Sequence, residues 1–499
     1  MDDAWDALLP RLKELTDLGH AIGLMEYDQA VSMPAKGSAA RSRAIGTLES
    51  LYHQRLTDPE IGRLLDRLEA ATALGPDESA SVRVLRRNYS IATKVPAALV
   101  RELGELRGLA YAAWLEARPA ADFSILQPHL ERMVELKKQE ADAIGWAGER
   151  YDALLDMYAP DVTAANVESL FAELVHGLVP LTEKILAAVG EPPEFLSETY
   201  DPDQQEAFCQ WLVEHVGFDK SGGRLDLSPH PFTMTVGAGD VRQTTKLTPN
   251  AICGSIYAAL HETGHALYEQ GIPERLLDLP AGHVASLGLH ESQSRLWENH
   301  VGRSRPFCDF ILPHLKERFP QQLGSVVPEE FYRGVNHPRR TLIRITADEV
   351  TYNLHVALRF ELELALFRDE LDVADLPDAW DAGMEKHVGI RPPDVSDGVL
   401  QDMHWPTGAL GYFPTYTIGT LYAAAFYERA VEQLGDLTEE LRAGETARLL
   451  GWLRENIHQH AYLRSPVDIA RDVIGGPLTA RPFLDHLRRK YGEIYELSV

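Results

Sequence analysis

Residues 261–265 read His-Glu-Thr-Gly-His, and their types and spacing are suited to metal-dependent hydrolysis. His261 and His265 are four residues apart, so on a helix both imidazoles project from one face and can bind the same metal ion. Glu262 lies beside them and can accept a proton from a metal-activated water. The alternative is a pair of hydrogen-bonded core histidines. The motif thus predicts a metal, a general base and a hydrolytic reaction.

A helix from about Ser255 to Gln270 must position these residues. This stretch contains no proline and only one glycine, Gly264, and stop signals follow at Gly271 and Pro273. It is apolar on most sides, as expected for a helix buried in a large domain. Polar side chains in a buried helix are costly unless they are satisfied, and a bound metal ion would satisfy them.

The third metal ligand is predicted to be Glu291, in a helix candidate spanning residues 285–299. A catalytic zinc commonly takes two histidines from one helix and a glutamate from a following helix, which leaves a position open for water. An ordinary surface glutamate is the alternative, and Glu298 lies two turns further along much the same face. His290 is a competing ligand, but it points about 100° away from Glu291.

Composition and charge indicate a globular protein of 499 residues without a nucleic-acid or membrane partner. A formal net charge of −27 argues against binding to nucleic acid or to an anionic membrane. We expect neither a signal peptide nor a membrane span. The three cysteines are scattered and suit a reducing cytoplasm.

The fold is predicted to be mainly α, with a small β-sheet beside the metal helix. Apolar residues recur at helical spacing in most of the chain. The predicted helices are residues 4–30, 38–75, 77–92, 96–117, 126–145, 163–190, 203–217, 328–335, 341–371, 377–387, 416–434, 438–461 and 480–494. Residues 224–236 and 241–247 alternate instead, with a turn between them, which predicts a hairpin. Such a strand could hold an extended peptide by main-chain hydrogen bonds.

Arg344 stands out because it falls within an apolar stretch that we predict to be helical. A buried arginine needs a carboxylate partner. That partner is either internal, such as Asp348 one turn on, or the free carboxylate of a peptide. An internal ion pair is the more common case in proteins.

Three further strings concentrate polar groups. His404 lies within Gly398–Trp405, together with an amide, a carboxylate and an indole. Tyr412 and Tyr416 lie in a loop that leads into a helix, where a phenol near the metal could stabilise an oxyanion. His230 is fixed between two prolines. Packing and turn formation are the alternatives for all four residues.

Taken in order, these strings resemble the Taq-type thermostable carboxypeptidases, zinc enzymes of the M32 class. The resemblance spans nearly the whole chain, and the joint set of motifs is highly specific. The matching strings are His230-Pro231-Phe232, Asp240-Val241-Arg242, His261 to His265, His290-Glu291-Ser292, Ile343-Arg344 with Ala347-Asp348, Gly398 to Trp405, Tyr412 to Gly419, and Tyr27-Asp28-Gln29 with Met33-Pro34. Tyr27 replaces the family's tryptophan, and Gln243 stands where we expect an apolar residue.

The resemblance implies a large helical body with a deep closed-end cleft and a gluzincin-like metal helix. Residues 1–200 are expected to roof the cleft, and residues 201–499 to form the catalytic part, as one continuous unit. Members of the family are usually homodimers.

The resemblance also implies a role for each matched residue. His261, His265 and Glu291 match the metal ligands, and Glu262 matches the general base. Arg344 matches a residue that binds the substrate's C-terminal carboxylate, and Tyr416 matches one near the scissile bond. The remaining matched positions line the site, and they are His230, Arg242, His404 and Tyr412.

The expected function is therefore a cytoplasmic metallocarboxypeptidase that releases the C-terminal residue of peptides with broad specificity. The expected cofactor is one Zn²⁺ per chain, although Co²⁺ and Mn²⁺ suit histidine and glutamate ligands as well. One alternative is a zinc oligopeptidase that cuts internally in short peptides, from which Arg344 at a blocked cleft end would distinguish it. A second alternative is a metal-stabilised scaffold, against which the intact Glu262 argues.

Overall fold

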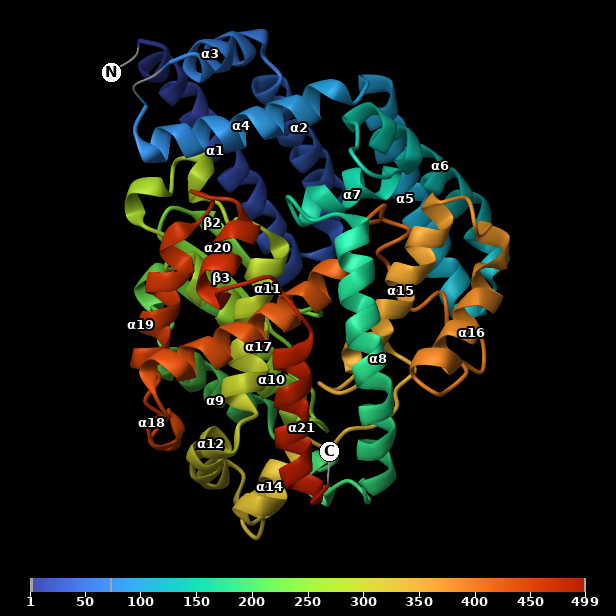
Figure 1. Cartoon of the computed structure of the whole chain (residues 1–499), viewed down its shortest axis with the longest axis vertical. Coiled ribbons are helices and arrows are strands. Elements are labelled where there is room, and N and C mark those ends of the chain that lie inside the picture. Colours follow the sequence, from blue (N-terminus) through green and yellow to red (C-terminus); the bar gives the residue numbers. More distant parts are fainter. Residues whose placement is uncertain (1–2, 72–73, 498–499) are drawn as a thin grey trace.

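The computed structural model describes residues 3–71 and 74–497, and the protein in this part of the chain is mainly helical (Figure 1). The only sheet among the described residues has three short strands, so the predicted fold class is confirmed. None of the helices in these two ranges combines the length and the hydropathy that a membrane crossing needs.

Helices make up the first part of the chain. They are α1 (Asp3–Val31), α2 (Ser38–Leu56), α3 (Pro59–Glu69), α4 (Pro76–Lys94), α5 (Ala97–Ala120), α6 (Gln127–Ile144), α7 (Arg150–Tyr158) and α8 (Ala164–Ala188). The metal-helix region follows with α9 (Pro202–His215), β1 (Gly223–Leu227), β2 (Thr233–Gly237), β3 (Asp240–Thr245), α10 (Ile252–Glu269), α11 (Leu287–Arg295) and a π-helical turn, η7 (Leu296–Gly302).

The rest of the chain is again helical. Its elements are α12 (Arg305–Arg318), α13 (Pro320–Leu323), α14 (Pro328–Val335), α15 (Tyr352–Phe367), α16 (Leu376–His387), α17 (Pro414–Leu434), α18 (Thr438–Arg442), α19 (Ala447–Asn456), α20 (Pro466–Ile474) and α21 (Arg481–Tyr495). Short 3₁₀ turns join many of the helices, among them η6 (Pro280–Gly282) and η8 (Arg344–Thr346).

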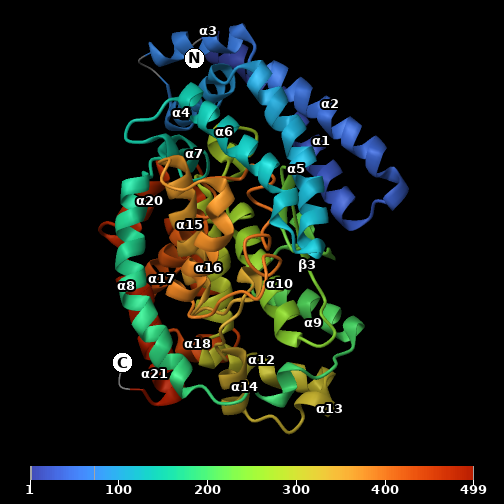
Figure 2. The ribbon, with the colours of Figure 1, turned by 90° about the vertical axis from the view of Figure 1, so that its right-hand side faces the viewer.

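The first helices form a projecting part at one end of the molecule. Helices α1 and α2 lie side by side and lean out from the body (Figure 2). Helices α1, α3 and α4 share an apolar cluster of their own, around Trp5, Leu8 and Leu65. Helices α5 to α8 instead contribute to the main core, together with the catalytic elements. The projecting part meets the body where α1 packs on β2 and α4 packs on η6.

The sheet differs in one respect from the expected hairpin. Strands β2 and β3 form an antiparallel hairpin, but residues 224–236 are not one strand. Strands β1 and β2 are separated by the segment Ser228-Pro229-His230-Pro231, because proline has no N–H group to donate to a neighbouring strand. Strand β1 instead pairs in parallel with β3, which gives the order β1-β3-β2. The sheet packs against α10, as predicted.

Three predicted helices are shorter than expected. The predicted helix over residues 38–75 ends at Leu56 and restarts at Pro59, where Asp58 caps α3 (residues 72–73 of that prediction lie outside the described part). Within residues 341–371 only α15 is α-helical, because Asp348 Oδ1 accepts the N–H groups of Val350 and Thr351 just before it. Residues 438–461 divide into α18, α19 and a 3₁₀ turn.

Helix α11 is held between α10 and α17 by two glycines that permit close approach. A Cβ added at Gly264 of α10 would lie 2.4 Å from the carbonyl oxygen of Gln293 and 2.5 Å from Cα of Ser294. A Cβ added at Gly419 of α17 would lie 2.5 Å from Cβ of Glu291. Both contacts are far too short for any side chain. The two glycines therefore fix how near α11 comes to its neighbours.

We predict that Gly264→Ala destabilises the protein by about 1–3 kcal/mol, because the added methyl group meets backbone that cannot move without separating the helices. Differential scanning calorimetry measures the change as a lower Tm. The control is Gly254→Ala in the same helix, where the nearest atoms lie 3.8 Å away. This control should match or exceed the wild-type Tm, since alanine favours helix over glycine. Equal Tm values for the two variants would contradict the packing argument.

Candidate metal centre

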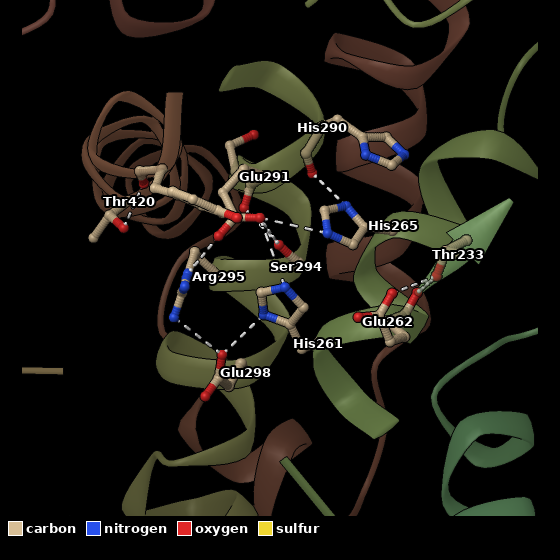
Figure 3. Close-up of polar contacts among 12 residues, drawn as sticks. Thr233, His261, Glu262, His265, His290, Glu291, Ser294, Arg295, Glu298 and Thr420 are labelled. Carbon is tan, nitrogen blue, oxygen red and sulfur yellow. Dashed lines mark hydrogen bonds and ion pairs between the residues drawn. The ribbon is translucent and has the colours of Figure 1, made fainter. Parts of the chain in front are cut away.

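The three predicted metal ligands converge on one point (Figure 3). Nε2 of His261 lies 3.6 Å and Nε2 of His265 lies 3.5 Å from Oε2 of Glu291. The two histidines come from successive turns of α10, and Glu291 comes from α11, which packs against it. The spacing of four residues and the return of the chain through residues 270–286 together assemble the group.

Each imidazole is fixed by a hydrogen-bond acceptor at its Nδ1 atom, while its Nε2 atom faces Glu291. Nδ1 of His261 lies 3.0 Å from Oε2 of Glu298, and Nδ1 of His265 lies 3.0 Å from the carbonyl oxygen of His290. Because both partners are acceptors, each Nδ1 carries the hydrogen and donates it. In the neutral rings both Nε2 atoms then present lone pairs towards the Glu291 carboxylate.

This arrangement favours a cation among the three donors. Burial, which is the largest effect, lowers the pKa of His265 to about 3, so its Nε2 is unprotonated at neutral pH. Burial opposes ionisation of Glu291, but Arg295 and the histidines lower the pKa of its carboxyl well below the usual value. Electron-pair donors that face one another repel unless positive charge lies between them. Two imidazoles and a carboxylate are a donor set that divalent zinc, cobalt and manganese accept, so these residues fit the expected metal.

Glu298 acts on this group although it is not one of the three donors. The π-helical turn η7 replaces the regular helix after Arg295, and Glu298 within it reaches His261. Arg303 Nη2 also donates to Glu298, at 3.3 Å. Such π turns recur at functional sites because they redirect side chains. Helical spacing predicts that Glu298 lies on the same face as Glu291, but it does not predict the contact of Glu298 with His261.

Glu262 points towards the sheet beside the metal group. The hydroxyl of Thr233, on β2, donates to Oε2 of Glu262 at 2.7 Å and also lies 3.0 Å from its backbone oxygen. Burial raises the pKa of the Glu262 carboxyl. A carboxylate with a raised pKa is a better proton acceptor near neutral pH. Nothing in the sequence singles out Thr233 as a partner of Glu262.

Arg344 lies in the 3₁₀ turn η8, and both its predicted helix and its suggested partner Asp348 are wrong. Its Nη2 donates to Asp402 Oδ1 at 2.8 Å, and its Nη1 donates to the Tyr352 hydroxyl at 3.1 Å. Asp348 is instead occupied with backbone N–H groups around the start of α15. The turn is possible because the backbone N–H of Arg344 donates to the side chain of Gln401 rather than to a helical carbonyl.

A second arginine shares the same carboxylate. Nε of Arg359, which is fully buried in α15, donates to Asp402 Oδ2 at 2.6 Å. Burial lowers the pKa of Arg359 to about 10, which leaves it charged at neutral pH. Two guanidinium groups thus contact one carboxylate, and Asp402 balances only one of them. The sequence signal for Arg359 was a cation inside the apolar run Val356 to Phe360.

Three of the five remaining predicted residues, His404, Tyr412 and Tyr416, lie together beside this arginine cluster. His404 Nε2 lies 3.4 Å from the Tyr416 hydroxyl, and its Nδ1 lies 3.9 Å from Asp402. The rings of Tyr412 and Tyr416 are 5.2 Å apart, and the Arg344 guanidinium lies over the Tyr416 ring. Burial raises the pKa of both tyrosines, and the Glu291 carboxylate adds to the rise. Tyr412 and Tyr416 therefore lie near both Glu291 and Arg344.

Of the other two predicted residues, Arg242 lies on the sheet and His230 lies in the bend between β1 and β2. His230 is exposed and precedes β2 by three residues, so it lies near the strand whose Thr233 contacts Glu262. Gln243 of β3 faces α10, where its side-chain oxygen accepts a hydrogen bond from Thr263. The preceding Arg242 therefore faces away from α10, where it pairs with Asp240 and lies over the ring of Tyr27.

Comparisons with known proteins agree on one family. A model described as carboxypeptidase Taq (M32) metallopeptidase matches residues 7–491. Thermostable carboxypeptidase 1 of Thermus thermophilus is 42% identical over 506 residues, with 99% of each chain covered. Thermostable carboxypeptidase 1 of Pyrococcus furiosus is 39% identical, with 97% of each chain covered.

A solved structure shows the same fold. The crystal structure of an M32 carboxypeptidase from Deinococcus radiodurans superimposes with a TM-score of 0.97 at 41% identity, and the match covers 99% of this chain and 100% of that one. The resemblance drawn from the motifs is thereby confirmed. The chain belongs to the carboxypeptidase Taq (M32) family of metallocarboxypeptidases.

Proposed function

We propose that this protein releases the C-terminal residue of peptides, with broad specificity, using one Zn²⁺ per chain held by His261, His265 and Glu291. The observation that carries the proposal is the convergence of these donors beside a buried, proton-accepting Glu262. Zinc is the metal for which two histidines and a glutamate with an open position are typical. Cobalt and manganese are the alternatives that the same ligands accept.

The bound metal would act as a Lewis acid that polarises the scissile carbonyl and lowers the pKa of a water. Glu262 takes the proton from the attacking water and then passes a proton to the leaving amine. The hydroxyl of Thr233 holds the Glu262 carboxylate in place while Glu262 accepts the proton and passes it on. Glu298 and the His290 carbonyl keep the two imidazoles in one orientation throughout.

The arginine cluster supports recognition of a free C-terminus. Arg344 and Arg359 together carry one more positive charge than Asp402 neutralises. A buried surplus of positive charge is costly, and a second carboxylate would relieve it. We propose that the substrate's terminal carboxylate takes that place at Arg344. Cutting would then be confined to the last peptide bond.

Tyr416 and His404 are proposed to stabilise the oxyanion, because they contact each other and Tyr416 lies near both Arg344 and Glu291. When Nε2 of His404 carries the ring hydrogen it donates to the Tyr416 hydroxyl, at 3.4 Å, and the hydroxyl can then donate to substrate. We propose that Tyr412 packs against the terminal residue. His230 and Arg242 are proposed to line the approach along the sheet.

The wider assignments are proposals of the same kind. We propose that residues 1–200 roof a cleft whose closed end is the arginine cluster, and that residues 201–499 carry the chemistry. The contacts of α1 with β2 and of α4 with η6 support this division. We also propose a cytoplasmic homodimer, the expectation that the cysteine content and the family resemblance favour.

We predict that Glu262→Gln keeps one metal ion per chain and loses activity by about a thousandfold, because the amide cannot accept the proton. Metal content by mass spectrometry and kcat on a tripeptide measure the two effects. Glu330→Gln, at an exposed position in α14, is the matched control and should retain both. Substantial turnover by Glu262→Gln would remove the base assignment.

We predict that C-terminal amidation of a peptide nearly abolishes its cleavage, because the amide carries no charge for Arg344 to meet. Arg344→Gln should lower kcat/KM for the free acid by about a hundredfold and erase the preference for it. Mass analysis of the products measures both effects. Arg339→Gln, at an exposed position, is the control. Equal cutting of amidated and free peptides would favour an oligopeptidase that cuts internally.

A further inference from the structure

A cavity of about 520 Å³ lies beside the C-terminal end of the metal helix α10. Helices α1, α2 and α4 form one side of it, and β2, the β2–β3 turn, the end of α10 and η6 form the other. It thus lies at the junction of the projecting N-terminal helices with the catalytic part. Its volume is in the range of sites that bind small ligands.

The two sides of the cavity differ in chemistry. The side formed by the N-terminal helices is largely apolar, with Leu12, Leu15, Leu56 and Leu85. The catalytic side presents the carboxylate of Glu269, the last residue of α10, with His283 nearby. His20 of α1 faces the same space, and Asp219 and Arg454 also line it. Such a site suits a ligand with an apolar body and one positive charge.

Glu269 is prepared to bind a cation. Its Oε1 lies 3.3 Å from Nε2 of His290. Burial alone would raise the pKa of the Glu269 carboxyl, but His290 and Thr235 hold it below the usual value, so the group is ionised at neutral pH. A carboxylate offers about four acceptor positions. The contact with His290 therefore leaves it able to accept hydrogen bonds from a ligand.

The cavity and the arginine cluster are connected to the metal ligands through different residues. His261 contacts Glu298, which Arg295 joins to Tyr352 and so to Arg344. The His265 ring instead stacks on His290 at 4.1 Å, and His290 meets Glu269. A peptide whose C-terminus lies at Arg344 and whose scissile carbonyl lies at the metal group would extend towards Glu269.

The separation fits a short peptide. Glu269 follows His265 by one turn of α10, which is about 6 Å along the axis. An extended chain advances about 3.4 Å per residue. The amino group that lies about 6 Å upstream of the scissile carbonyl is that of the residue before the penultimate one. In a tripeptide this group is the free amino terminus, and in a tetrapeptide the terminus lies one residue deeper in the cavity.

We propose that Glu269 and this cavity form a subsite for the free amino terminus of tripeptide and tetrapeptide substrates. The ammonium group binds the Glu269 carboxylate, and the first side chains of the peptide pack against the apolar wall from α1, α2 and α4. This inference rests on the proposed carboxypeptidase function. It adds that the enzyme recognises both ends of a short peptide, whereas in longer peptides the amino terminus lies beyond Glu269.

Binding of matched peptides to a variant that does not turn over tests the subsite. Metal-loaded Glu262→Gln is titrated by calorimetry with a tripeptide that has an apolar first residue, and with the same tripeptide N-acetylated. The free amine should bind about tenfold more tightly, as expected for one charge-assisted hydrogen bond. Adding Glu269→Gln should make the two affinities equal. Adding Glu274→Gln, at an exposed position five residues further on, should leave the tenfold difference unchanged.

Kinetics of the otherwise wild-type protein give the second readout. Acetylation should raise KM for the tripeptide about tenfold with little change in kcat, and it should not affect an octapeptide. Equal affinities of the free and acetylated tripeptides, or a difference that survives Glu269→Gln, would overturn the subsite. If the wild-type protein released no C-terminal residue from any peptide, the proposed function would fail, while the calorimetric comparison would still decide the subsite.

Discussion

Two imidazole nitrogens and a carboxylate oxygen lie within 4.8 Å of one another, and the surrounding side chains and backbone hold them there. All three atoms are electron-pair donors, so their proximity costs energy unless a cation joins them. The protein fixes each donor from behind. Glu298 holds His261, the His290 carbonyl holds His265, and Arg295 holds the far oxygen of Glu291. Because these supports come from α11 and the π turn that follows it, placing α11 correctly sets the geometry of the whole site.

The position of α11 is set by its packing against two glycines, which have no side chain. Gly264 and Gly419 let α10 and α17 approach α11 so closely that neither position accepts a Cβ. The π turn η7 brings Glu298 to His261, and Arg303 also donates a hydrogen bond to Glu298. On the other face, Tyr412 and Tyr416 join the metal group to the pair of arginines on Asp402. A few close helix contacts thus bring together the three metal ligands, the proton acceptor Glu262 and the excess positive charge of the two buried arginines.

The sequence predicted best what depends on local spacing. The interval of four between His261 and His265, the helix around them and the acidic residue on the next helix all follow from helical periodicity. The sequence did not predict the backbone conformation where long-range contacts determine it. Arg344 lies outside any α-helix because Gln401 and Asp402, more than fifty residues away, take its backbone and side-chain hydrogen bonds. Glu298 and Arg359 were missed for the same reason, since only the fold shows which buried charge meets which partner.

The most direct test of this metal site is a crystal structure of the metal-loaded protein with anomalous scattering at the metal edge. We expect one ion per chain, bound by Nε2 of His261 and of His265 at about 2.0–2.1 Å and by the Glu291 carboxylate. We also expect the two Nδ1 contacts, with Glu298 and with the His290 carbonyl, to stay unchanged. An ion held by other residues, or imidazoles that turn away from Glu291 when the metal binds, would contradict this assignment.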